Sequence, residues 1–136
     1  RALKVTGTGG VPAYAAAVVL NVTVARSNTN SHLTVYPAGV ARPGTSTINF
    51  TRGAAVANAT TVRAGTGGRI QLFSPAGCTP VVVDVVGYHV AGSPVAEGGF
   101  AAVTPSRRYD SRPDPLGCVR ANRPRAIPIA GRSGVP

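Results

Sequence analysis

Acidic side chains are the rarest reactive groups in this 136-residue sequence, which contains only Asp84, Glu97, Asp110 and Asp114. General acid–base catalysis needs two carboxylates brought together. Asp84 lies inside the apolar run 81–86, where an unpaired charge would cost several kcal/mol. We therefore expect Asp84 to meet an arginine or backbone donors as a structural ion pair. Asn21 takes the matching place in VVLNVTV (18–24), and we expect it to hydrogen-bond across a turn or bulge.

Nucleophiles and metal ligands lack the spacing that their chemistry requires. His32 and His89 could join a serine in a catalytic triad, but the sequence contains no Gly-x-Ser-x-Gly turn. It also contains no Cys/His cluster with the spacing of a metal site. We therefore predict no catalytic residue, no metal site and no cofactor.

The segment around residue 110 mixes charges of both signs. Asp110 and Asp114 could offer oxygen ligands to calcium. The interpretation that we favour is structural: ion pairs or carbonyl contacts pin an irregular loop, and they involve Arg107, Asp110 and Arg112.

Aromatic side chains offer the main alternative to a purely structural role. Sugar-binding β-sandwiches present flat aromatic rings, most often Trp, but this sequence has no Trp, 4 Tyr and 3 Phe. A tyrosine at a sheet edge commonly packs its ring and leaves only its hydroxyl in water. The candidate glycan-binding residues are Tyr36, Tyr88 and Tyr109.

Two cysteines occur, Cys78 and Cys118, without a CxxC motif. In a secreted chain their simplest use is a disulfide. It would close a loop of about 40 residues, worth about 4 kcal/mol through the lost entropy of the unfolded chain. It would also clamp the arginine-rich end to the sheet. The alternative is two unrelated buried thiols.

The net charge of +10 comes from 14 Lys and Arg against 4 Asp and Glu. The arginines between residues 26 and 69 occur singly near turns, and seven others gather in residues 107–132. Proteins that bind single-stranded nucleic acid interleave such charge with stacking aromatics, and this stretch has Tyr109 alone. We therefore expect no nucleic-acid partner. A basic surface of this kind keeps a chain soluble or meets anionic polymers such as cell-wall glycans.

Alternating apolar and polar residues predict the elements that carry these groups. Leu20, Val22 and Val24 alternate with polar neighbours, and so do Leu33 and Val35. The run 81–86 is nearly continuous and predicts a strand buried on both faces. Further strands are expected at 54–62, 100–104 and 125–129. Turn signals rich in Gly, Pro and Asn separate these segments.

Composition narrows the fold class. Hydrophobic residues make up 43% of the chain, too many for simple disorder. The 17 Gly and 12 Pro would break long helices, and no apolar run is long enough to span a membrane. We predict an all-β fold, an antiparallel, jelly-roll-like β-sandwich with few or no helices.

The two ends of the sequence repeat each other. Residues 1–12 read RALKVTGTGGVP and residues 125–136 read RAIPIAGRSGVP, identical at 6 of 12 positions with a constant offset of 124. A repeat at fixed spacing is typical of an array. We therefore interpret 1–104 as the β-sandwich core of one unit. Residues 105–136 are then an Arg/Pro-rich segment that links to the next unit or opens it.

A family resemblance supports the same division. The segments VPAYAAAVVLNVTV, HLTVYPAGVARPGTSTINF, AVANATTV, GGRIQLFSPAG and VVVDVVGY resemble a tandem repeat of secreted and cell-surface actinobacterial proteins, in the same order. SRRYDSR (106–112) is similar to the LLDTR segment that opens each unit of that family. Arg108 and Tyr109 depart from it, because two aliphatic residues usually stand there. The resemblance implies an all-β accessory module without an established catalytic role.

These observations lead to one functional hypothesis with an alternative. We expect a non-catalytic, extracellular structural module, repeated head to tail in a cell-surface stalk, appendage or fibre. Its partners would be neighbouring copies or units. The alternative is a module that binds cell-wall polysaccharide and anchors a secreted enzyme; a fibre domain of a phage or injection system is a weaker third. Since the sequence begins at Arg1 without Met, we expect any signal peptide to lie outside it.

Overall fold

The computed structural model describes residues 2–90, 100–110, 117 and 119–124, with the backbone alone for 100–110. This described part of the chain is built from strands and contains no helix. The strands are β1 (Ala2–Lys4), β2 (Ala15–Ala25), β3 (Ser31–Pro37), β4 (Ile48–Phe50), β5 (Ala55–Arg63), β6 (Arg69–Phe73), β7 (Cys78–Thr79), β8 (Val81–Val90), β9 (Phe100–Asp110) and β10 (Val119–Arg120).

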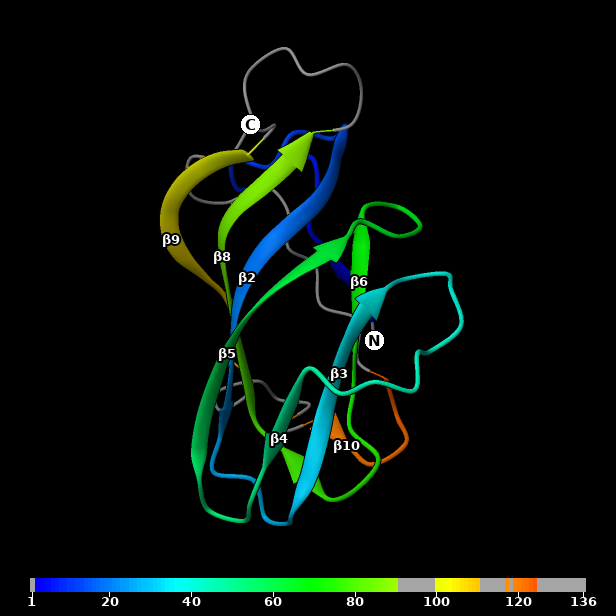
Figure 1. The fold of residues 1–136 in the computed structure, drawn as a ribbon, viewed down its shortest axis with the longest axis vertical. Helices are drawn as coiled ribbons and strands as arrows, with labels where there is room; N and C mark the ends of the chain where they lie inside the picture. The colour runs from blue at the N-terminus through cyan, green and yellow to red at the C-terminus, as the bar shows by residue number, and fades with distance from the viewer. Residues whose placement is uncertain (1, 91–99, 111–116, 118, 125–136) are drawn as a thin grey trace.

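The strands form two four-stranded sheets and one short ribbon. One sheet has the order β1-β6-β3-β4, the other has the order β5-β2-β8-β9, and β7 pairs with β10. Every described pairing is antiparallel. Figure 1 shows β5, β2, β8 and β9 along one side of the molecule and β3, β4 and β6 along the other. The predicted all-β, antiparallel fold is confirmed, whereas the β-sandwich and its jelly-roll-like arrangement stay predictions.

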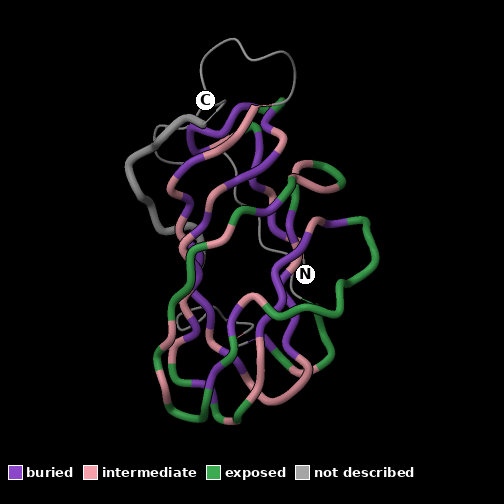
Figure 2. The backbone as a smooth tube through the Cα atoms, in the orientation of Figure 1, coloured by how far each residue is buried: buried purple, intermediate pink, exposed green. Residues whose placement is uncertain are grey.

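One hydrophobic core lies between the two sheets. It includes Leu20 and Val22 from β2, Leu33 from β3 and Leu72 from β6, all fully buried. Because successive side chains of a strand point to opposite faces, the alternation in the sequence places these residues on the inner face of each sheet. Figure 2 shows the resulting change between buried and more exposed residues along the strands of both sheets.

Strand β9 is longer than predicted. The expected strand 100–104 continues to Asp110 and pairs with β8 as far as Val82↔Asp110. The sheet of the predicted core unit thus extends beyond residue 104. β9 is an edge strand, which accommodates Pro105, because an edge strand need not donate every backbone N–H to a neighbour. The strand expected at 125–129 lies outside the described residues.

Candidate functional site

A polar row crosses the β5-β2-β8-β9 sheet at its middle. Asn21 of β2 lies opposite Asp84 of β8, and Asp84 lies opposite Arg107 of β9. Asn21 and Asp84 are half-buried, and each stands between core residues, so both occupy the outer face of the sheet. The register therefore brings together two residues that the sequence placed only in matching segments. It also puts an arginine position beside Asp84, and the ion pair itself stays a prediction.

The burial of β8 corrects part of the sequence interpretation. Val81, Val82 and Val83 are buried, as expected for a strand covered on both faces, but Asp84 and Val86 are only half-buried. Asp84 is thus partly open to water, and a charge at such a position carries a smaller desolvation cost than a fully buried one.

The predicted irregular loop at residues 107–110 is wrong, because these residues belong to β9. A register shift between Val83 and Asp84 accommodates the extra residue in the β8–β9 ladder. Such a bulge keeps a strand paired where the count of residues differs on its two sides. The register places Asp110 opposite Val82. Arg112, Glu97 and Asp114 lie outside the described residues.

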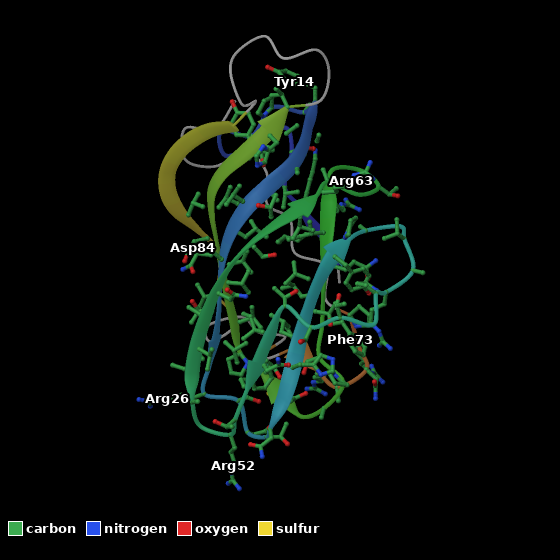
Figure 3. The ribbon with its side chains drawn as sticks, in the orientation of Figure 1. Tyr14, Arg26, Arg52, Arg63, Phe73 and Asp84 are labelled. Carbon is green, nitrogen blue, oxygen red and sulfur yellow. The ribbon has the colours of Figure 1, made fainter. Side chains whose placement is uncertain are left out.

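The candidate glycan-binding tyrosines differ in exposure. Tyr36 is 5% exposed, so its ring is not open to a sugar. Tyr88 is half-buried and packs against the core. Tyr109 is placed only by its backbone, opposite Val83. Sequence reasoning missed Tyr14, which is 69% exposed and is labelled at one end of the molecule in Figure 3. The alternation of apolar and polar residues could not identify Tyr14 as exposed, because Tyr14 lies just before β2 and outside the strand.

The loop that follows β3 is hydrogen-bonded to the strand that carries Tyr36. The Thr34 hydroxyl donates to the Thr45 carbonyl over 3.1 Å, and the Val35 N–H donates to the Thr47 hydroxyl over 2.9 Å. These bonds hold residues 38–47 beside the outer face of β3. From this loop the Arg42 guanidinium lies 3.9 Å from the centroid of the Phe73 ring, a cation–π contact.

The covered tyrosine makes a specific polar contact. Its hydroxyl donates to Oε1 of Gln71 over 3.1 Å. Burial raises the pKa of the Tyr36 hydroxyl above its ordinary value, and the positive charge of Arg42 opposes that rise. The hydroxyl is protonated at neutral pH, as any tyrosine is, and the raised pKa extends the range in which it can donate this bond to higher pH.

The histidines are not brought together. His32 lies on β3 opposite Asn49, and His89 lies on β8 opposite Ala17, so the two stand in different sheets. Across the residues that the structure describes, no group of three His, Cys, Asp or Glu side chains could hold a metal ion. No helix in that same part is long and apolar enough to cross a membrane.

The cysteine region joins β7 to β10. Cys78 is disulfide-bonded, and it pairs through its backbone with Arg120. Cys118 lies outside the described residues, so the assignment of this pair stays a prediction. The β7–β10 ladder itself ties residues 119 and 120 to the main body of the chain.

The N-terminal strand is the most distinctive candidate for a binding site. Among the described strands β1 forms an edge of its sheet and pairs with β6, with Leu3 opposite Ile70 and Lys4 opposite Arg69. Leu3 and Val5 are fully buried in the core, although they lie at the end of the chain. A short edge strand that contributes core side chains creates a position that an equivalent strand could fill.

Comparison with known proteins finds no match: no protein-family model, no curated protein and no solved structure is significantly similar to this chain.

Proposed function

We propose that this chain is a non-catalytic structural module that joins like units head to tail. The observation that carries the proposal is the N-terminal segment 1–12, whose residues Leu3, Val5 and Val11 are buried in the core. The sequence of this segment recurs at 125–136 with the offset 124. A chain that carries the buried first strand of its fold a second time contains the start of another unit.

The geometry of such a joint determines the assembly. The two segments stand at opposite ends of the sequence, so the contact between neighbouring units would be heterologous. Heterologous contacts generate a ring when the rotation closes and an open filament when it does not. A stalk, appendage or fibre at the cell surface is the corresponding structure.

The proposed location is extracellular. Cys78 is disulfide-bonded, and disulfides persist mainly in oxidising compartments. The outer surface of a cell also suits a protein with a net charge of +10, because wall polymers are commonly anionic and would concentrate a basic protein.

Removal of the second segment tests the proposal. The full chain and a chain that ends at Pro124 are compared by light scattering over a range of concentrations. We expect the full chain to gain mass with concentration and the shortened chain to remain monomeric. Circular dichroism serves as the control, because both chains should show the same β-structure. Equal, monomeric masses for two folded chains would contradict the proposal.

Cell-wall polysaccharide binding is the second candidate, favoured by the exposed ring of Tyr14. An amphipathic tyrosine on the surface can stack on a sugar. Purified cell wall is used to capture the unchanged chain and a Tyr14→Ala variant. Loss of capture in the variant supports this function. Tyr36→Phe is the matched control, since that ring is buried. Under the structural proposal neither substitution changes capture.

A further inference from the structure

We infer that the position of β1 beside β6 is a binding site for residues 125–129 of a second copy of this chain. The inference rests on the proposed head-to-tail function and specifies its joint. In the chain itself this position holds Ala2–Lys4. The incoming segment would take the same register, since its sequence aligns with residues 1–5 at a constant offset.

The core side of the site fits the second segment. Leu3 and Val5 are fully buried, and the repeat places Ile127 and Ile129 at their positions. Both replacements are aliphatic and close in volume, the kind of exchange that a packed core tolerates best. Further along, the buried Val11 has an identical counterpart in Val135.

The alternating direction of the backbone N–H groups along β1 explains why the repeat can contain a proline. The Val5 N–H donates to the Gly68 carbonyl, and polar groups of an antiparallel strand point alternately toward and away from their neighbour. Lys4 therefore directs its N–H away from β6, toward the open edge. Pro128 occupies this position in the repeat. A proline there costs no ladder hydrogen bond.

Replacing Lys4 by its counterpart Pro128 also removes an unfavourable contact between two positive charges. Lys4 lies directly opposite Arg69, and like charges opposite each other in a sheet are destabilising. Pro128 removes one of the two charges. The second segment thus keeps the apolar contacts of β1 and lacks its charge repulsion.

After β1 the chain contains three glycines with positive φ, and the repeat keeps glycine at two of them. Gly7 and Gly10 have φ values of +74° and +87°, which favour glycine because it has no Cβ. The repeat keeps glycine at both places, Gly131 and Gly134. Gly9, at φ +61°, has Ser133 as its counterpart, so this turn fits less well than the strand that precedes it.

The strand β1 competes for the site, because it is tethered to the sheet that it pairs with. Tethering gives β1 a high effective concentration. A second copy therefore enters the site of the unchanged chain slowly, and weakening β1 raises the rate. Leu3→Asp weakens β1, since it places a charge where a fully buried side chain now packs.

Cross-linking tests the register directly. Ala2 faces Gln71 across the β1–β6 ladder, so Ala126 of a second copy would face Gln71 as well. By the alternation described above, the residue opposite Gln71 forms a non-hydrogen-bonded pair with it. The Cα atoms of such a pair lie within the range that a disulfide spans. An acceptor chain carrying Leu3→Asp and Gln71→Cys is mixed with a donor chain carrying Ala126→Cys. The control acceptor replaces Gln71→Cys by Asn58→Cys, because Asn58 is exposed on β5.

We expect severalfold more cross-linked dimer with Gln71→Cys than with Asn58→Cys, and we expect Ile127→Asp in the donor to remove the excess. A second pair of acceptors carries Gln71→Cys or Asn58→Cys and keeps Leu3, so the result does not depend on whether the Leu3→Asp variant folds. In this pair too, Gln71→Cys should give more cross-linked dimer than Asn58→Cys, but the dimer should form more slowly. Equal yields at the two positions overturn the inference. If the unchanged chain associates but Gln71→Cys is not preferred, the joint lies elsewhere and the proposed function stands. If the chain does not associate at all, both fail.

Discussion

The outer faces of the two four-stranded sheets differ, although their inner faces are alike. In the β1-β6-β3-β4 sheet the outward side chains Thr34, Tyr36 and Phe73 are buried. In the β5-β2-β8-β9 sheet the outward Val82 is also buried, but Val19, Asn21 and Asp84 remain half-buried. On this first sheet the 38–47 loop hydrogen-bonds to β3 and places Arg42 over Phe73. The two faces therefore differ in what they offer a partner.

This difference bears on where function can reside. A covered face stabilises the module but offers no open aromatic side chain, as the 5% exposure of Tyr36 illustrates. The β5-β2-β8-β9 face carries the polar groups Asn21 and Asp84 in register, and β1 forms the sheet edge at which we propose that a second copy binds. Binding is therefore expected at an edge or on the polar face rather than at Tyr36.

The largest expected effect comes from the buried Phe73 ring on the outer face of the β1-β6-β3-β4 sheet. Phe73→Ala should lower the free energy of unfolding by about 3–5 kcal/mol, the range for loss of a buried aromatic. Val19→Ala is the matched substitution at an outward, half-buried place on β2. It should cost about 1 kcal/mol or less, because less apolar area is lost. Urea denaturation measures both; equal losses would mean that the two faces do not differ energetically.

A glycine at the base of the loop gives the next effect. A Cβ on Gly65 would overlap the backbone N and O atoms of Ala38. Backbone atoms cannot move aside as a flexible side chain can, so Gly65→Ala should cost about 1–3 kcal/mol. Gly44 lies in the loop itself with open space around it. Gly44→Ala should be neutral or should stabilise by about 0.4–1 kcal/mol through the unfolded state. Thermal unfolding of both variants checks the contrast, which disappears if the loop is loosely held.

The buried hydroxyl on the covered face gives a pH-dependent effect. Tyr36→Phe removes the bond to Gln71, worth about 1 kcal/mol at neutral pH. Because burial raises the pKa of Tyr36 in the folded state, the unfolded chain loses this proton first as pH rises. The stabilisation is therefore complete below pH 10 and declines as pH rises toward the folded-state pKa. Between pH 8 and 11 the free energy of unfolding, measured by urea denaturation, should fall more steeply with pH for the unchanged chain than for Tyr36→Phe. Parallel curves would contradict the assignment.

Particular residues show what the sequence could predict. The alternation that includes Leu20 and Val22 identifies core positions correctly. Every second side chain of a strand points to the inner face, and on that face the side chains are buried. Tyr36 continues the same alternation on the outer face, where the pattern predicts exposure, yet it is buried; no local period reveals the contacts of a distant loop residue such as Arg42. The matching segments around Asn21 and Asp84 indicate equivalent roles, but only the β2–β8 register makes them neighbours. Residues 105–110 contain Pro105 and two arginines, so an edge strand resembles a loop in sequence.

The smallest effect isolates the contact between the loop and the sheet. Arg42→Ala removes the guanidinium from the Phe73 ring and should cost about 0.5–1 kcal/mol. Arg63→Ala, at an exposed place on β5, removes the same charge and should leave stability nearly unchanged. Arg42→Ala should also raise the pKa of Tyr36 further, because the arginine charge now lowers it. Absorbance titration of the tyrosinate reports that shift. Arg63→Ala should not produce it, so a similar shift in both variants would mean that Arg42 acts only through net charge and not through its position over the sheet.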